Sequence, residues 1–322
     1  MRAVTIQDGN LVVEERDDPA PGKGELLVRV RAAGLNGADM LQRQGGYPAP
    51  PGSPPDIPGL ELAGEVQALG PAATRFEEGE RVMAVVGGGG HAELALVHER
   101  AAMPVPEVRR AGEGPQPLDW PEAGGLPEVF TTAHDALFTQ ADLHLGEHLL
   151  VHGAAGGVGT AAVQLGRAAG ARVTATVRNE ELRPRVEELG ARVVAPDGFA
   201  EEGPFDVVLE LVGASNLTDN LRALATGGRI AVIGVGGTGP KGEISLVMLM
   251  QKRGRIHGST LRARPLEEKA AAMRAVEREV LPNFENGTLR VPVAETFPLE
   301  RAGEAYDRFA AGGKLGKIVL VP

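Results

Sequence analysis

A run of small residues at positions 154–159 is the part of this sequence with the clearest chemical meaning. It reads AAGGVG, which is nearly the dinucleotide fingerprint G-x-G-x-x-G, with Ala154 in place of the first glycine. An apolar run, HLLVHG, precedes it, and a helix-forming stretch follows. Small residues let the backbone approach a pyrophosphate, and a helix N-terminus offers free N–H groups. This context predicts a cofactor site rather than a plain glycine-rich turn, with Ala154 tolerated if its φ is negative.

The end of the next predicted strand indicates which dinucleotide would bind. In NAD-binding proteins an Asp or Glu about 20 residues beyond the glycines accepts a hydrogen bond from the ribose. Here Thr176 and Val177 stand at that position, and Arg178 follows. An arginine forms charge-assisted hydrogen bonds with a 2′-phosphate, so we predict NADP(H). The alternative is that Arg178 is a solvated loop residue, compensated by the acidic residues Glu180 and Glu181.

The elements around these residues change character along the chain. Up to about Val105, short apolar runs broken by turn residues predict a β-rich region, with a Pro-rich loop at 48–58. Residues 106–125, rich in Pro and Gly, predict a surface connection. From Thr131 onward, helix-length segments alternate with short apolar runs, which predicts βαβ units and a parallel sheet. A helix over 265–284 and a terminal strand follow.

Composition excludes several classes of function. The chain has 322 residues, of which 43% are hydrophobic, and this length predicts two domains. A net charge of −10 argues against nucleic-acid binding and against a polybasic membrane patch. Cysteine is absent, which excludes disulfides, thiolate nucleophiles and cysteine-bound zinc. We find no signal peptide and no membrane-spanning segment, so we expect a cytoplasmic protein.

Several longer stretches together carry a family resemblance that spans nearly the whole chain. The chain resembles the zinc-independent NADPH:quinone oxidoreductases, the zeta-crystallin-like group of the medium-chain dehydrogenase/reductase superfamily. The stretches are RAAGLNGADMLQRQGGYPAPPG, IPGLELAGEV, FEEGERVMAVV, HGAAGGVGTAAVQLGRAAGA and GKIVLVP, in this order.

The resemblance implies an α/β protein with two domains. A GroES-like, β-rich catalytic domain would comprise residues 1–122, completed by the C-terminal segment 265–322. A Rossmann domain with a doubly wound, parallel six-stranded sheet would comprise residues 123–264. The resemblance also implies that the cofactor lies in the cleft between the domains and that the chain forms a homodimer. The strand expected in KRGRIHGSTLRA, residues 252–263, would be the sheet edge that pairs with the second copy.

The same resemblance allows the metal ligands of zinc-containing relatives to be compared with this sequence. The ligand positions correspond to Asn36, Leu60 and Glu128. A catalytic zinc needs three donor side chains, and Leu60 has none, so we predict no metal site. His91 and His98 are not expected to form a metal-binding pair.

Asn36 and Tyr47 are the predicted catalytic residues, because the resemblance places their segment beside the nicotinamide. Asn36 would orient the cofactor or donate a hydrogen bond to the acceptor oxygen. Tyr47 would donate a hydrogen bond or cover the acceptor, unless it is only a packed lid residue. A second tyrosine of some relatives is replaced by Leu41. Asp39 would either cap the local backbone or touch ligand.

The remaining candidates come from loops at the carboxyl ends of the parallel strands, where ligands bind in such folds. The predicted cofactor-binding residues are Asn36, Thr131, Ala155, Gly156, Gly157, Val158, Thr176, Arg178, Val212, Gly213, Gly234, Val235, Thr260, Leu261, Lys314 and Lys317. Lys314 and Lys317 would help to hold the 2′-phosphate, and Arg262 and Arg264 would lie close to the carboxamide. For these four side chains a plain surface position is the alternative.

These observations predict an NADPH-dependent oxidoreductase that transfers hydride to a quinone or similar conjugated carbonyl without a metal. Quinones and enones are already good hydride acceptors, so they need no metal Lewis acid. The alternatives are an enoyl or alkenal C=C reductase and a non-catalytic NADPH-binding protein. The expected partners are a small quinone or enone and a second copy of the chain, with no nucleic acid and no membrane.

Overall fold

The computed structural model describes residues 1–109 and 114–322, and the chain divides into two compact units. The first unit comprises Met1–Thr131, Leu261–Gly312 and Lys317–Pro322, and the second comprises Thr132–Thr260 and Gly313–Gly316. These limits differ from the expected domain limits at 122 and 265. The first unit extends beyond residue 122 because α2 (Trp120–Gly124) packs closely on β3 (Glu25–Gly34).

A seven-stranded sheet forms the core of the first unit, in the order β16-β17-β3-β4-β5-β7, with β6 also paired to β3. Its pairs are antiparallel except β16 with β17, which is parallel. Apolar side chains such as Leu26, Val28 and Leu62 fill the buried face. Besides β3, its strands are β4 (Glu61–Leu69), β5 (Arg81–Val85), β6 (Leu94–His98), β7 (Ala102–Pro104), β16 (Val293–Pro298) and β17 (Lys317–Val321).

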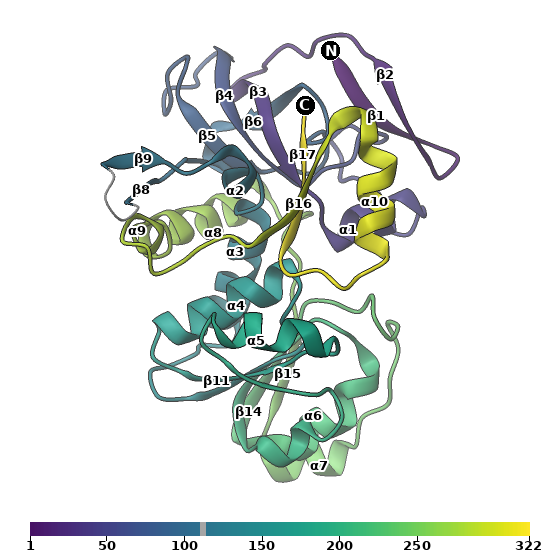
Figure 1. The fold of residues 1–322 in the computed structure, drawn as a ribbon, viewed down its shortest axis with the longest axis vertical. Helices are drawn as coiled ribbons and strands as arrows, with labels where there is room; N and C mark the ends of the chain where they lie inside the picture. The colour runs from purple at the N-terminus through teal and green to yellow at the C-terminus, as the bar shows by residue number, and fades with distance from the viewer. Residues whose placement is uncertain (110–113) are drawn as a thin grey trace. The chain divides into compact units, whose positions relative to one another are not determined.

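Two short antiparallel strand pairs and a set of helices complete the first unit (Figure 1). The pairs are β1 (Arg2–Gln7) with β2 (Asn10–Glu15), and β8 (Glu107–Arg109) with β9 (Pro115–Pro117). The helices are α1 (Gly37–Arg43), α2, α3 (Pro127–His134), which runs into the second unit, α8 (Leu266–Glu279), α9 (Leu281–Glu285), α10 (Ala302–Ala310) and the short turns η1 (Glu99–Ala101) and η6 (Leu299–Arg301).

Two sequence-based expectations for this unit were wrong in detail. The connection expected over 106–125 contains the β8–β9 pair and α2, and its residues 110–113 lie outside the described residues. The helix expected over 265–284 is two helices, because α8 ends at Glu279 and α9 starts at Leu281 with Pro282 in its first turn. Proline has no N–H to continue the hydrogen-bond ladder of α8.

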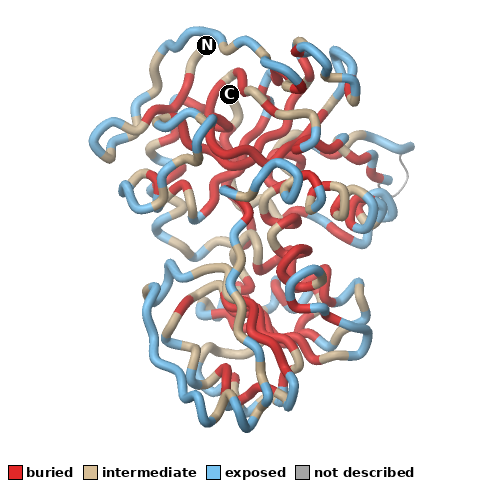
Figure 2. The backbone as a smooth tube through the Cα atoms, turned by 180° about the vertical axis from the view of Figure 1, so that it is seen from behind, coloured by how far each residue is buried: buried red, intermediate tan, exposed pale blue. Residues whose placement is uncertain are grey.

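The second unit is built on a six-stranded sheet in which every pair is parallel, as predicted. The strand order β12-β11-β10-β13-β14-β15 reverses between β10 and β13, which is where doubly wound folds bind ligands. Figure 2 shows these strands as a largely buried bundle. The strands are β10 (His148–Val151), β11 (Arg172–Thr176), β12 (Arg192–Val194), β13 (Phe205–Glu210), β14 (Leu224–Val232) and β15 (Arg255–Gly258).

Helices cover both faces of this parallel sheet. Figure 1 shows α4 (Gly157–Ala168) and α5 (Arg183–Glu187) over one face, and α6 (Leu217–Ala223) and α7 (Leu246–Lys252) over the other. Shorter helical turns are η2 (Asp135–Gln140), η3 (Glu180–Leu182), η4 (Phe199–Glu202) and η5 (Ala214–Asn216). No helix in the described part of the chain is long and apolar enough to cross a membrane.

Candidate active site and cofactor-binding loops

The loop between β10 and α4 has the geometry of a dinucleotide-binding turn. The positive φ that the turn requires, 62°, falls on Gly153, so Ala154 is tolerated where the fingerprint has glycine. At Gly159 a side chain cannot fit, because a Cβ would lie 2.5 Å from the carbonyl oxygen of Gly153. The close approach of helix and strand therefore depends on Gly159, as the fingerprint requires.

The first turn of α4 is available to an anion. Gly156 is the N-cap residue, and no side chain caps the helix. The N–H groups of the following residues, including Gly157 and Val158, therefore have no partner from a capping side chain. A helix N-terminus of this kind favours a phosphate both by its N–H groups and by its dipole. This arrangement fits the pyrophosphate of a dinucleotide.

Residues 313–316 of the C-terminal tail lie beside this loop in the second unit. The N–H of Gly316 donates to the carbonyl of Ala155 at 2.8 Å. The Lys314 ammonium donates to the carbonyl of Gly316 at 2.8 Å. A Cβ on Gly313 would lie 3.7 Å from Nδ2 of Asn179. The tail therefore brings Lys314 into the neighbourhood of the residue that follows Arg178.

Arg178 is exposed after the end of β11, and its guanidinium makes no hydrogen bond or ion pair with residues that the structure describes. Of the two acidic residues that follow, the Glu180 carboxylate pairs with Arg183 at 3.2 Å, and Glu181 is bonded among the described residues only through its backbone, whose N–H donates to Oδ1 of Asn179. Thr176 is different, because its buried hydroxyl lies 3.0 Å from Nδ1 of His152. Of Thr176 and Arg178, both predicted to bind the cofactor, only Arg178 has a side chain with no partner among the described residues.

A buried polar network supports the loop after β13, and sequence reasoning missed it. One oxygen of the Glu210 carboxylate accepts from the N–H of Val212 at 2.7 Å and from that of Gly213 at 2.9 Å. Its other oxygen accepts from Asn220, whose Oδ1 lies 2.7 Å from Nε2 of His152. The network holds the predicted residues Val212 and Gly213 in place. The sequence feature that could have predicted this network is Glu210, an acidic residue at the end of the apolar run DVVLE.

The other strand-end residues also take defined positions. Gly234 packs on the preceding loop, where a Cβ would lie 2.6 Å from the carbonyl oxygen of Leu211. Val235, next to it, is 37% exposed. Thr260 is exposed at the end of the second unit, whereas Leu261 is buried in the first. Thr131 is buried in the first unit, with its hydroxyl 3.5 Å from the sulfur of Met273.

The predicted role of Lys317 as a phosphate ligand is corrected by its position. Lys317 is 2% exposed, and its ammonium lies in the first unit against oxygens of three residues. The distances are 2.7 Å to the carbonyl of Leu35, 2.8 Å to Oδ1 of Asn36 and 2.6 Å to Oε1 of Glu61. An ammonium has three donors, and all three are used here. Lys317 is therefore the cation of a buried cluster, and Lys314 alone remains a phosphate candidate.

The side chain of Asn36 is engaged in the same cluster. Its Oδ1 accepts from Lys317, and its Nδ2 donates to Glu61 at 3.0 Å and to the carbonyl of Gly34 at 3.3 Å. The Asp39 carboxylate accepts from the N–H of Asn36 at 2.8 Å and from that of Gly59 at 3.1 Å, so Asp39 caps local backbone. Any catalytic or cofactor role of Asn36 must therefore act through an amide that these contacts orient.

Glu128 is the third of the residues compared with zinc ligands. Its backbone N–H donates to Oε2 of Glu61 at 2.9 Å. Burial, together with the nearby Glu61, raises the pKa of Glu128 from its ordinary 4.5 to about 8. At neutral pH the carboxyl therefore carries a proton and adds no second negative charge beside Glu61.

The donors at these positions do not suit zinc. Leu60 is buried hydrocarbon, and the Asn36 amide oxygen already accepts from an ammonium. His91 and His98 have separate partners, the hydroxyl of Tyr306 and the N–H of Arg100. Within residues 1–109 and 114–322, no group of three or more His, Cys, Asp or Glu side chains is arranged to hold a metal ion.

Tyr47 is half-buried and lies beside Arg262. The guanidinium carbon of Arg262 is 5.2 Å from the centre of the Tyr47 ring, and Nη1 donates to the Tyr47 carbonyl at 2.9 Å. Burial raises the pKa of Tyr47, while the nearby Arg262 cation opposes that shift. The phenol is therefore neutral at physiological pH and can donate a hydrogen bond.

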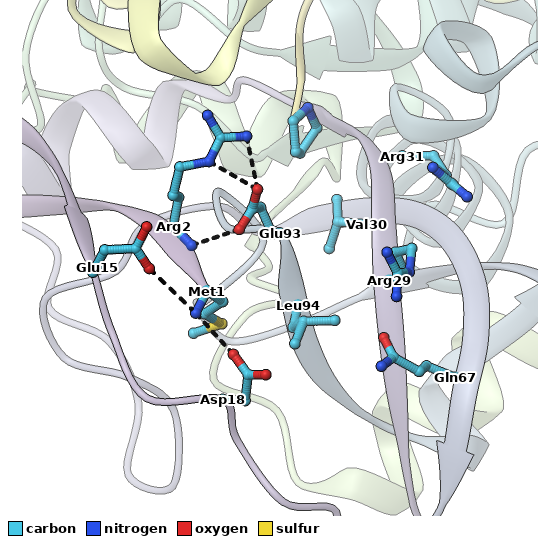
Figure 3. Close-up of a pocket in the computed structure, with 11 residues that line it drawn as sticks. Met1, Arg2, Glu15, Asp18, Arg29, Val30, Arg31, Gln67, Glu93 and Leu94 are labelled. Atoms are coloured by element: carbon cyan, nitrogen blue, oxygen red, sulfur yellow. Dashed lines mark hydrogen bonds and ion pairs between the residues drawn. The ribbon is translucent and has the colours of Figure 1, made fainter.

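A cavity of about 420 Å³ in the first unit lies away from these residues (Figure 3). Charged groups line it, and several of them pair with one another. Arg2 pairs with Glu93 at 2.7 Å, and the N-terminal amine pairs with Asp18 at 2.8 Å. None of the predicted site residues lines this cavity.

Replacing Glu128 by Gln should flatten the pH dependence of stability. The folded protein holds the Glu128 proton more tightly than the unfolded chain. Its contribution is therefore fully present below about pH 4.5 and is lost as pH rises through about 8. We expect Glu128→Gln to gain about 1–3 kcal/mol over the native protein near pH 9, less than the full shift because Glu128 retains some solvent access. Melting temperatures from about pH 5 to 9 measure this, with exposed Glu78→Gln as control. Parallel curves for Glu128→Gln and the native protein would contradict it.

Comparison with known proteins gives the site its family context. The model of the alcohol dehydrogenase GroES-like domain matches residues 22–107, and that of the zinc-binding dehydrogenase matches residues 157–278. Quinone oxidoreductases from Homo sapiens and Rattus norvegicus are 33% and 31% identical, over 100% of this chain and 98% of each relative. An acryloyl-coenzyme A reductase from Metallosphaera sedula is 30% identical, over 99% of both chains.

Solved structures agree with this assignment. An alcohol dehydrogenase superfamily protein from Novosphingobium aromaticivorans superposes with a TM-score of 0.84 at 29% identity, covering 100% of this chain and 99% of that one. An NAD-dependent alcohol dehydrogenase superposes with a TM-score of 0.83 at 28% identity, covering 100% of both. These similarities confirm the GroES-like and Rossmann architecture and imply a nicotinamide cofactor. The chain is an oxidoreductase that belongs to the quinone oxidoreductase family of the medium-chain dehydrogenase/reductase superfamily.

Proposed function

We propose that this protein uses NADPH to reduce a quinone or a similar conjugated carbonyl by hydride transfer. The observation that carries the choice of NADPH is Arg178, an exposed cation at the end of β11 with no partner among the residues that the structure describes, where NAD-binding folds have an acid. The choice of acceptor is supported by the full-length relatives named quinone oxidoreductase.

The residues of the second unit fit NADPH by their chemistry. The uncapped first turn of α4 would hold the pyrophosphate through backbone N–H groups. Arg178 and Lys314 would hold the 2′-phosphate, and the loops at Val212–Gly213 and Gly234–Val235 would flank the rest of the cofactor. When bound, NADPH supplies the hydride. The chain's own part is to orient the cofactor and the acceptor.

We further propose that catalysis proceeds without a metal, although one matching family model is described as zinc-binding. The support is the donor set, since Leu60 has no ligand atom and Lys317 occupies the oxygens of Asn36 and Glu61. A conjugated carbonyl is electrophilic without a Lewis acid. Its oxygen needs only a hydrogen bond as charge develops, which we assign to the Tyr47 hydroxyl, with water supplying the final proton.

Reduction of an activated C=C bond is the second candidate, because the acryloyl-coenzyme A reductase of Metallosphaera sedula is similar over its whole length. NADPH consumption measured with a quinone, with an enone and with no acceptor separates the candidates. A rate with quinone alone supports the first proposal, and a rate with enone alone supports the second. The absence of a rate with any acceptor would leave a protein that binds NADPH without turnover.

Replacing Arg178 by Ala should raise the KM for NADPH roughly 10-fold or more, because one charge-assisted hydrogen bond contributes about 1.5–3 kcal/mol. The KM for NADH should hardly change, since NADH lacks the 2′-phosphate. Arg185→Ala, an exposed arginine on the nearby α5, is the matched control and should behave as the native enzyme. Equal use of NADPH and NADH by the native enzyme would reject the proposal.

Extended dialysis against a strong chelator should leave turnover intact, because the site offers no donor set for zinc. Elemental analysis before and after dialysis provides the measurement. Finding one zinc per chain, lost together with activity and restored by added zinc, would show that metal-free catalysis is wrong.

We also propose that two copies associate through the second unit. β15 is an edge strand of the parallel sheet, and an unpaired edge favours pairing with another chain. On the nearby α7, Met248 and Leu249 pack on the core of this unit, whereas Leu246, Val247 and Met250 are 64%, 64% and 74% exposed. Exposed apolar side chains grouped on one helix are typical of an interface.

Sedimentation at micromolar concentration should give a homodimer, and Met250→Asp should shift the protein to monomers by placing a charge in the interface. Leu145→Asp, at a residue 83% exposed outside α7, is the control and should remain dimeric. A native protein that sediments only at the monomer mass of 33.6 kDa would reject the dimer.

A further inference from the structure

Arg262 is a buried arginine whose contacts all lie within the first unit. It is 2% exposed and follows Leu261, the residue at which the chain re-enters this unit. Its Nε donates to the carbonyl of Gly87 at 2.8 Å, and its Nη2 donates to Oε1 of Gln42 at 2.6 Å. Its Nη1 donates to the carbonyl of Tyr47 at 2.9 Å.

These acceptors belong to three separate segments. Gly87 is in the glycine loop after β5, Gln42 is on α1, and Tyr47 precedes the Pro-rich segment 48–58. Gln42 also donates through Nε2 to the carbonyl of Pro55 at 3.3 Å. The Arg262 guanidinium therefore holds the start of the Pro-rich segment directly, and it holds a later part of it through Gln42.

The contacts are costly for a purely structural residue. Burial lowers the pKa of Arg262, because removing the charged guanidinium from water costs free energy. The three acceptors are neutral, so no carboxylate at hydrogen-bond distance compensates that cost in these contacts. A planar guanidinium can bond in three directions within one plane, which no apolar side chain can replace. The geometry is suited to fixing the segments relative to one another.

The ring of Tyr47 is held as well as its backbone. The guanidinium carbon lies 5.2 Å from the ring centre, within the range of a cation–π contact. Arg262 therefore restricts both the main chain and the side chain of Tyr47.

We propose that Arg262 is a positioning residue that fixes Tyr47 and the segment 48–58 for the carbonyl acceptor. This inference rests on the proposed function, in which Tyr47 shapes the acceptor site. It differs from the sequence-based expectation, in which Arg262 lies close to the carboxamide of the cofactor. Loss of Arg262 should therefore affect the acceptor and not NADPH.

The test compares Arg262→Met, which removes the charge, with Arg262→Lys, which keeps the charge but lacks the planar fork. Arg301→Met is the matched control, because Arg301 lies 5.6 Å from the ring centre of Phe297 at the surface. For Arg262→Met we expect the acceptor KM to rise up to about 10-fold, the effect of losing the hydrogen bond of a Tyr47 that is no longer held in place, with the NADPH KM unchanged. Arg262→Lys should lie between it and the native enzyme, and the control should match the native enzyme.

A second readout does not depend on activity. The chain has two tyrosines, and burial holds the pKa of Tyr306 well above its usual value, so tyrosinate absorbance at moderately alkaline pH reports on Tyr47. The Tyr47→Phe counterpart of each variant supplies the blank. Removing the Arg262 cation should raise the pKa of Tyr47, whereas Arg262→Lys should change it less.

Three results would overturn the proposal or its basis. A rise in the NADPH KM with no change for the acceptor would assign Arg262 to the cofactor. Loss of activity in proportion to loss of folded protein, with an unchanged Tyr47 titration in Arg262→Lys, would assign it to stability alone. Native acceptor kinetics in Tyr47→Ala, together with a shifted titration in Arg262→Met, would place the failure in the proposed role of Tyr47.

Discussion

The buried ammonium of Lys317 imposes the strongest constraint on the first unit. A cation removed from water costs several kcal/mol unless acceptors surround it, and Lys317 is 2% exposed. Its acceptors are the Leu35 carbonyl, the Asn36 amide and the Glu61 carboxylate. This requirement binds the first residue of β17 to the end of β3 and the start of β4. Gly34 must lack a side chain, because a Cβ there would lie 2.4 Å from Oε1 of Glu61.

The same cluster orients the residues assigned to the acceptor. Glu61 uses its second oxygen to hold the N–H of Glu128 at the start of α3. Asn36, fixed by Lys317, begins α1, and Gln42 on that helix meets Arg262. Polar contacts at the two ends of α1, with Lys317 and with Arg262, therefore connect the C-terminal strand to the segment that carries Tyr47. The Glu61 carboxylate pairs with the Lys317 cation, and a protonated Glu128 adds no second negative charge, so the net charge of this interior stays small.

The second unit distributes its polar groups in the opposite way. The N–H groups after β13 are satisfied internally by Glu210, so that loop is rigid and offers no anion site. The first turn of α4 has no capping side chain, and Arg178 has no partner among the described residues. Donors without a partner among the described residues are thus present where the proposed phosphates would bind. The N–H groups of the loop after β13 are bonded internally, whereas those of the first turn of α4 have no capping side chain. This difference would orient the proposed cofactor, with its phosphates at α4.

Local sequence patterns predicted the parallel sheet, the glycine turn and the cation Arg178 at the end of the second strand, because each depends on neighbours in the chain. The division of the helix expected over 265–284 is also predictable from the sequence, because Pro282 has no N–H to continue the hydrogen-bond ladder. Lys314 and Lys317 mark the limit of such reasoning, since they stand in one short motif and appear equivalent. Only the tertiary structure separates them: Lys317 meets partners more than 280 positions away. Whether a charged side chain faces solvent or a buried acceptor depends on long-range packing, which local periodicity does not encode.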